Sequence, residues 1–161
     1  MVTENRPRAR RVITGTDGGG KSAITSDEPT SSWVERAGGA TVMEIWRAEA
    51  LPARIEGQGT LPGGGVPDPP PQGLAIRVCT FPPEGEVDPG LGREGEIPGM
   101  HSTETVDVVT VISGELFVVT ETGDTLLRPG DSVVQRGTRH AWRNRSDQTA
   151  VVVAVMMAGE R

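Results

Sequence analysis

Short runs of Val, Ile and Thr, interrupted every few residues by Gly or Pro, limit what this 161-residue chain can fold into more than any other feature. Glycine occurs 22 times and proline 13 times, and the apolar residues do not recur at helical spacing. The pattern predicts about ten strands, which favours an all-β sandwich or barrel. The expected strands cover residues 12–14, 22–25, 41–47, 74–81, 105–112, 115–120, 125–127, 132–135, 139–143 and 150–157.

The whole chain, residues 1–161, is expected to form a single domain, because its length suits one domain with a working core. Two long segments rich in Gly and Pro, residues 57–73 and 82–99, interrupt the strand pattern. Long segments of this kind are lids, binding loops or mobile surface loops, and the sequence leaves these alternatives open. Residues 1–10 are interpreted as a flexible tail and residues 11–50 as N-terminal strands.

Composition argues against nucleic acid as a partner. The net charge is -6 at pH 7, and the chain has no Tyr, three Trp and two Phe. It therefore offers neither a basic stripe nor a set of stacking aromatic rings. The arginines near the N-terminus, Arg6, Arg8, Arg10 and Arg11, are interpreted as part of a solvated tail.

The expected compartment follows from the cysteine count and from apolar runs. The single Cys79 excludes an internal disulfide, and the opening MVTENRPRARR lacks the apolar stretch of a secretory signal. The longest apolar run, residues 150–158, is far shorter than the ~20 residues that span a bilayer. We therefore expect a cytoplasmic protein with no membrane role.

Residues 15–22 read GTDGGGKS and satisfy the spacing of a phosphate-binding loop. Such a loop requires a helix directly after its lysine, because the helix N-terminus faces the phosphates. The following residues 23–29 are few, include β-branched residues and end in Pro29, which argues against a helix. The stretch is interpreted as a hairpin turn, and no nucleotide cofactor is expected.

The only two histidines lie in two motifs of the C-terminal half. In GEIPGMHSTETVDVVTVISG, residues 95–114, the side chains of His101, Thr103 and Asp107 alternate along an expected strand and share one face. The second histidine, His140, follows in GTRHAWRN together with Trp142. Imidazole and carboxylate groups are therefore expected to face a common interior.

These motifs resemble those of the cupin family, which are Gly, five residues, His-x-His, three or four residues, Glu, six residues, Gly, and then Gly-x-x-His-x-x-x-Asn. The resemblance, nearest to small single-domain bacterial cupins, implies a double-stranded β-helix, or jelly-roll barrel, over residues 74–157 with extra N-terminal strands. It also implies a site inside the barrel. Against the family's three His and one Glu, His101 and His140 match, Thr103 replaces the second His, and Asp107 replaces the Glu.

Two histidines and one aspartate are the ligand set of a facial triad. His101, Asp107 and His140 are therefore the predicted ligands of one divalent transition metal, Fe, Mn, Ni or Zn. Asp is one methylene shorter than Glu, so Asp107 either binds the metal or orients a histidine ring. The alternative is a barrel in which the histidines only form hydrogen bonds within a polar pocket.

Thr103, Trp142 and Arg77 complete the predicted substrate pocket. Arg77 and Cys79 share one face of the strand expected at residues 74–81, but the sequence does not say which face is inward. Facing the pocket, Arg77 would hold a substrate carboxylate or phenolate. Trp142 either stacks on a ligand or fills the barrel, and Cys79 is interpreted as a core or interface residue.

The resemblance and the pocket together predict a small metal-dependent enzyme acting on a small organic substrate, aromatic or polyketide-like, in the barrel. Dehydratase, cyclase or decarboxylase chemistry with the metal as Lewis acid is favoured over a dioxygenase reaction. A non-catalytic ligand-binding or sensing cupin is the alternative. The expected partners are the small-molecule substrate and a second copy of the chain in a homodimer, because apolar strands such as residues 41–46 and 150–157 need cover.

Overall fold

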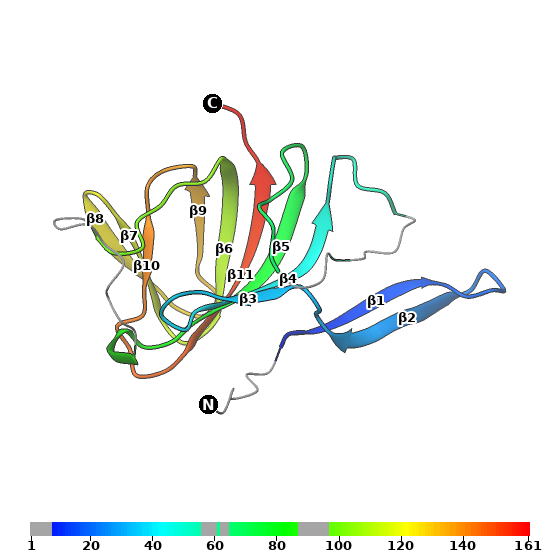
Figure 1. Cartoon of the computed structure of the whole chain (residues 1–161), viewed down its shortest axis with the longest axis horizontal. Helices are drawn as coiled ribbons and strands as arrows, with labels where there is room; N and C mark the ends of the chain where they lie inside the picture. The colour runs from blue at the N-terminus through cyan, green and yellow to red at the C-terminus, as the bar shows by residue number, and fades with distance from the viewer. Residues whose placement is uncertain (1–7, 56–60, 62–64, 87–96) are drawn as a thin grey trace.

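The computed structural model describes residues 8–55, 61, 65–86 and 97–161, and these form eleven strands and one short 3-10 helix (Figure 1). The all-β prediction is confirmed. In chain order the elements are β1 (Arg10–Thr16), β2 (Ser22–Pro29), β3 (Trp33–Glu35), β4 (Thr41–Ala48), β5 (Leu74–Phe81), η1 (Glu84–Glu86), β6 (Thr105–Ser113), β7 (Leu116–Thr120), β8 (Gly123–Leu127), β9 (Ser132–Arg136), β10 (Ala141–Arg143) and β11 (Ala150–Ala158).

Residues 1–7 of the predicted tail, parts of both predicted loops and the first glycine of the histidine motif lie outside the described residues. Arg10 and Arg11, which were assigned to a solvated tail, instead begin β1. Strand β3 was not predicted, because it has only three residues and no alternating run. Within the part of the chain that the structure describes, no helix is long and apolar enough to cross a membrane.

Two sheets build a jelly-roll barrel. The larger has the order β3-β4-β5-β11-β6-β9, and the smaller has the order β10-β7-β8. All paired neighbours within both sheets run antiparallel. Because β11 pairs with β5 on one side and β6 on the other, the last strand of the chain occupies the middle of the larger sheet (Figure 1).

The core lies where alternate residues of β5, β6 and β11 meet the small sheet. Val111, Leu116 and Val152 are at most 1% exposed, and strand β6 alternates buried and half-buried residues along most of its length. This alternation is expected when one face of a strand points into a core. Gly114 follows β6 with φ +71°, and a Cβ there would lie 2.8 Å from Cα of Ala150. Only glycine fits this close approach, which explains the glycine of the motif.

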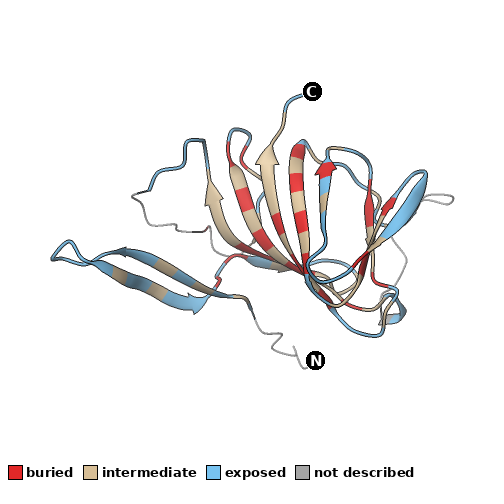
Figure 2. Cartoon of the chain, turned by 180° about the vertical axis from the view of Figure 1, so that it is seen from behind, coloured by how far each residue is buried: buried red, intermediate tan, exposed pale blue. Residues whose placement is uncertain are grey.

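The N-terminal strands β1 and β2 form a hairpin that projects from the barrel (Figures 1 and 2). The predicted hairpin turn is confirmed: Oδ1 of Asp17 accepts hydrogen bonds of 2.9 Å from the N–H groups of both Gly19 and Lys21, and Gly20 has φ +78°. Ser22 begins a strand, not the helix that a phosphate-binding loop needs.

Candidate functional site

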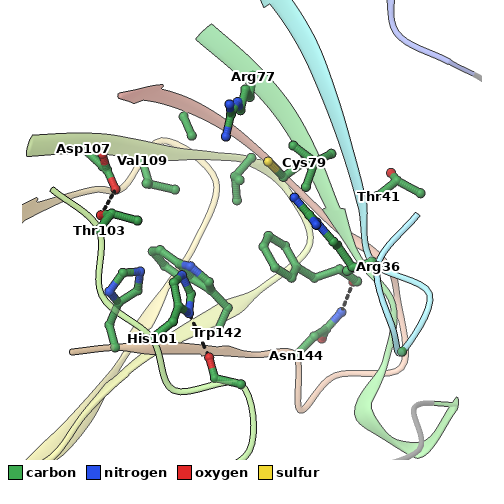
Figure 3. A pocket seen from close by; sticks show the side chains of 18 of the residues that line it. Arg36, Thr41, Arg77, Cys79, His101, Thr103, Asp107, Val109, Trp142 and Asn144 are labelled. Atoms are coloured by element: carbon green, nitrogen blue, oxygen red, sulfur yellow. Dashed lines mark hydrogen bonds between the residues drawn. The ribbon is translucent and has the colours of Figure 1, made fainter. Parts of the chain in front are cut away.

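A cavity of about 710 Å³ lies inside the barrel, lined by side chains from both sheets (Figure 3). All six residues predicted for the site line it: His101, Thr103, Asp107, His140, Trp142 and Arg77. Five of them, all but Arg77, were expected to face a common interior from their positions along the expected strands, whereas the orientation of Arg77 was left open; the role of each residue stays a prediction. Two further polar residues of functional interest, Arg36 and Glu44, were not singled out by the sequence.

The two histidines are held side by side by their backbones. The N–H of His101 donates to the carbonyl of His140 at 2.9 Å, and the N–H of His140 donates to the carbonyl of His101 at 2.8 Å. Residues that exchange both hydrogen bonds across an antiparallel pair project their side chains on the same side. The ring centroids accordingly lie 4.4 Å apart, with the ring planes inclined at 50°.

Both imidazole rings are oriented through Nδ1. The Nδ1 of His101 lies 2.8 Å from the carbonyl oxygen of Gly99, and the Nδ1 of His140 lies 3.0 Å from that of Thr138. The side-chain amide of Gln135 also contacts Nδ1 of His140. A ring that donates from Nδ1 to a carbonyl keeps the lone pair on Nε2 when it is neutral. His101 can thus offer Nε2 to a proton, a ligand or a metal. His140 does so in the tautomer that carries its proton on Nδ1 and donates to Thr138, whereas a hydrogen bond from the donor-only NH2 of Gln135 to Nδ1 belongs to the other tautomer.

His140 is the more buried of the two histidines, at 3% exposure. Burial has the largest effect and lowers the pKa of His140, while the hydrogen bond to Thr138 raises it. Two smaller effects act in opposite directions: the charge of His101 lowers this pKa and the charge of Asp107 raises it. Desolvation acts in this direction because it disfavours the charged imidazolium. His140 is therefore neutral at neutral pH.

Asp107 is a buried carboxyl group with an unused acceptor. It lies on β6 at 4% exposure, and its Oδ2 accepts a long hydrogen bond of 3.4 Å from the hydroxyl of Thr103. The Thr103 oxygen in turn accepts a hydrogen bond of 2.8 Å from Thr105. The other oxygen, Oδ1, has no hydrogen-bond partner among the described residues. Buried polar atoms without partners are rare and point to a missing donor.

The types of side chain in the site suit a transition metal, but their arrangement does not. Two imidazole Nε2 atoms and a carboxylate oxygen are the ligand types of a facial triad. Yet no group of three His, Cys, Asp or Glu side chains that could hold a metal ion occurs within the described ranges. The structure brings His101 and His140 together, but it does not place Asp107 with them as a third ligand. These residues do not fit a three-ligand centre as they stand, and no catalytic step is derived through a metal.

Arg77 faces the cavity, which settles the question of orientation that the sequence left open. Its Nε and Nη2 each lie 3.2 Å from Oε2 of Glu44, a side chain with no exposed surface. Oε1 of Glu44 accepts a hydrogen bond of 3.0 Å from Arg47, which also pairs with Glu49 at 2.9 Å. The charge of Arg77 is thus compensated inside the protein. The one signal for Glu44 in the sequence is a charged residue within the otherwise apolar start of β4.

Aromatic rings and a thiol form part of the cavity wall. The ring of Trp142 lies 5.5 Å from that of His140 in an edge-to-face arrangement and 6.2 Å from that of Phe81. Burial raises the pKa of the Cys79 thiol to about 11, opposed by the charges of Arg77 and Arg36. A thiol of this kind is protonated at neutral pH and is a poor nucleophile, consistent with interpreting Cys79 as a core residue.

The sequence of this chain is similar to a protein-family model and to several known proteins. A family model described as a cupin domain matches residues 80–156. Phomopsin biosynthesis cluster protein C′ of Diaporthe leptostromiformis is 39% identical over 77 residues, which cover 47% of this chain and 35% of that protein. A cupin-domain-containing oxidoreductase of Neurospora crassa is 28% identical over 146 residues, which cover 86% of this chain and 67% of that protein. The chain thus spans about a third of the length of the phomopsin relative.

A solved structure extends the likeness to the whole chain. A protein from Salmonella typhimurium LT2, named as a candidate ethanolamine utilization protein Q, superposes with a TM-score of 0.51. The match covers 95% of this chain and 98% of the other, at 10% sequence identity. Likeness at this identity concerns the fold alone.

Proposed function

We propose that this chain is a member of the cupin superfamily, as the match of a cupin domain model to residues 80–156 supports, and that it is a small enzyme acting on an organic molecule held inside its barrel. The observation that carries the proposal is the convergence of two imidazoles and a buried carboxyl group on one cavity of about 710 Å³. Cavities of roughly 300–1,000 Å³ with apolar walls and a few convergent polar groups are typical small-molecule sites.

The chemistry proposed for the histidine pair is proton transfer at a carbon next to a carbonyl group. Nε2 of neutral His140 takes the proton, and the electron pair of the broken C–H bond passes into the carbonyl to form an enolate. His101, the exposed member of the pair, takes up a proton from water at Nε2 and passes it to a leaving hydroxyl group, which departs as water, while His140 later releases its proton to solvent. Dehydratase- and isomerase-type reactions begin with this step, and a decarboxylase ends with its reverse.

A divalent transition metal, Fe, Mn, Ni or Zn, bound at the histidine pair is a separate proposal. Two adjacent Nε2 atoms and the unpartnered Oδ1 of Asp107 support it. Elemental analysis of protein purified without a metal-affinity tag is the test. We expect metal that is lost in His101→Ala and His140→Ala. If Asp107 is a ligand in solution, Asp107→Asn weakens binding by about tenfold or more, and Asp107→Glu retains it. Protein that carries no metal, and takes up none of the four, contradicts this proposal.

The relatives support a biosynthetic setting. One is named for a phomopsin biosynthesis cluster and another as an oxidoreductase. We propose that the substrate of this chain is likewise an intermediate of secondary metabolism. The name of the second relative also keeps an oxygenase reaction as a competing proposal, which oxygen consumption by the iron-loaded protein tests.

Deuterium exchange tests the proton-transfer proposal without knowledge of the natural substrate. The protein is incubated in D₂O with β-hydroxy ketones, β-keto acids and enolisable aromatic ketones, and deuterium incorporation or conversion is followed by NMR. The assay is run with chelator and again with each of the four metals. We expect exchange with at least one class and a loss of at least a hundredfold in His140→Gln, in line with the usual contribution of a general base. No exchange in any condition would favour the non-catalytic ligand-binding alternative.

We also propose that the chain forms a homodimer through its N-terminal hairpin. Val12 and Ile24 on that hairpin are 47% and 60% exposed. A lone two-stranded hairpin is marginally stable in water, and a second copy packed against it would cover these side chains. Light scattering is expected to give twice the chain mass of 17.0 kDa. The monomer mass at working concentration contradicts this proposal.

A further inference from the structure

Three arginines line the cavity, Arg36, Arg77 and Arg143, and their charges differ in availability. Arg143 forms an ion pair of 3.1 Å with Glu84. Arg77 was the predicted anchor for a substrate anion, but its guanidinium is already bound by Glu44 on two nitrogens and by the carbonyl of Pro67. A cation paired in this way has little remaining attraction for a ligand anion. Arg36 is an exposed residue that also lines the cavity, and no carboxylate among the described residues forms an ion pair with it.

Arg36 is presented by the tight turn between β3 and β4. Its N–H donates to the carbonyl of Ala40 at 2.7 Å, and its carbonyl accepts from Gly39 at 3.0 Å. The backbone is thus fixed, while the side chain extends over the cavity toward Cys79 (Figure 3). The positive charge of Arg36 is among those that act on the Cys79 thiol, which places it within electrostatic reach of the cavity wall.

A second unused group lies on β6, next to the edge strand β9 of the same sheet. Oδ1 of Asp107 is buried, lines the same cavity and has no donor among the described residues. The wall of the same cavity also carries Phe81, Trp142 and Val109. The cavity therefore lacks an anion for Arg36 and a hydrogen-bond donor for Asp107, and it offers aromatic and aliphatic surface to a ligand.

We propose that the ligand of this barrel is an aromatic hydroxy acid, whose carboxylate pairs with Arg36 and whose hydroxyl group donates to Oδ1 of Asp107. This assignment rests on the proposed function for the place of binding, but it does not depend on any reaction. The sequence prediction had Arg77 bind the substrate anion. Here Arg36 binds the ligand carboxylate, and Arg77 stabilises the fold through its pair with Glu44.

Calorimetric binding of matched probes tests the carboxylate contact. The probes are 4-hydroxyphenylacetate, 4-hydroxycinnamate and 6-hydroxy-2-naphthoate, each compared with its methyl ester. We expect at least one acid to bind the native protein about tenfold or more tightly than its ester, as a charge-assisted pair allows. Arg36→Gln is expected to remove this difference, and Arg36→Lys to keep part of it. The matched control is Arg54→Gln, because Arg54 is exposed and lies outside the cavity.

The hydroxyl contact is tested with the methoxy analogue of the tightest acid. We expect the native protein to prefer the hydroxyl compound by about tenfold, since only it can donate. Asp107→Ala is expected to lose this preference, while Asp107→Asn, which keeps an acceptor oxygen and the shape, retains part of it. Thermal unfolding of both variants shows whether the fold is retained.

The two proposals fail in different ways. If the protein binds the acids selectively but shows no turnover in the deuterium-exchange assay, the ligand assignment stands and the proposed enzymatic activity is refuted. Turnover of neutral ketones without a preference for acids refutes the ligand assignment alone. Equal affinity of acid and ester, an unchanged preference in Arg36→Gln, or no binding of any of the three acids at millimolar concentration overturns the assignment.

Discussion

The barrel and the N-terminal hairpin are built from similar strands, but their apolar side chains are buried in the barrel and exposed in the hairpin. In the barrel, β11 is paired along both edges and Val152 is 1% exposed, whereas in the hairpin β1 and β2 pair only with each other and Ile24 is 60% exposed (Figure 2). The same alternation of β-branched residues is thus buried in one region and exposed in the other. Burial depends on whether a second sheet faces the strand, which local patterning does not encode.

The largest effect is expected from Glu44, the most buried charged group of the barrel. Glu44→Ala leaves Arg77 without its partner in a buried setting, and removal of one partner of such a pair typically costs about 3–5 kcal/mol. Urea unfolding measures this loss. The double variant Glu44→Leu with Arg77→Met is expected to recover most of it, because no unpaired charge remains. A loss below about 1 kcal/mol in Glu44→Ala would mean that the pair is solvated in solution.

Truncation of an apolar side chain in each region sharpens the comparison directly. Leu116 has no exposed surface, so Leu116→Ala is expected to lower the free energy of unfolding by about 2–5 kcal/mol. Ile24→Ala is expected to change it by no more than about 0.5 kcal/mol in a dilute, monomeric sample. Urea unfolding at matched concentrations compares the two. Equal losses would show that the hairpin packs against the barrel.

The buried histidine at one end of the barrel predicts a pH dependence of stability between pH 7.5 and 5, and residues 10–29 of the hairpin contain no histidine. Burial lowers the pKa of His140 below its ordinary value of 6.5, so the unfolded chain takes up this proton first as the pH falls. Proton uptake by the unfolded state lowers stability, so the contribution of His140 is favourable above pH 6.5 and declines below it. Urea unfolding between pH 7.5 and 5 is expected to show a steeper decline in native protein than in His140→Gln. Parallel profiles would contradict the buried, neutral ring.

The smallest effect is expected at the tip of the hairpin. Lys21 is exposed and follows the turn without a helix, so Lys21→Ala is expected to change stability by no more than about 0.5 kcal/mol. Titration with ATP and GTP completes the test. Nucleotide binding by the native chain that disappears in this variant would show that the loop binds phosphate after all.

The spacing of the two motifs was sufficient to find most of the candidate site. Asp107 lies on β6, but this strand begins at Thr105, so His101 and Thr103 precede it and do not belong to the alternating strand that the sequence predicted. They line the same cavity as Asp107, His140 and Trp142, and an isolated bridge that the sequence did not predict joins His101 to His140. The orientation of Arg77 was not predictable from the sequence, because both faces of β5 carry apolar residues and only its place between β4 and β11 decides which is inward.

Arg36 and Glu44 could not be found from the sequence for a related reason. Glu44 meets Arg77 only because β4 and β5 pair in a register that joins residues far apart in the chain. Arg36 reaches the cavity only because a short, unpredicted strand, β3, turns back onto β4. Long-range pairing decides the position of Glu44, whereas the position of Arg36 depends on a local hairpin whose first strand is too short to be recognised from its sequence.

The positions of His101 and His140 in the site are set by the backbone and do not depend on their side chains. Main-chain hydrogen bonds, not the imidazoles, hold these two positions opposite each other. Other side chains can therefore occupy them without rebuilding the wall. In evolution, a single substitution at either position would therefore change the functional group that faces the cavity. The distance between the two positions would stay the same, because the backbone sets it. The same property makes positions 101 and 140 the natural place to install new reactivity by design.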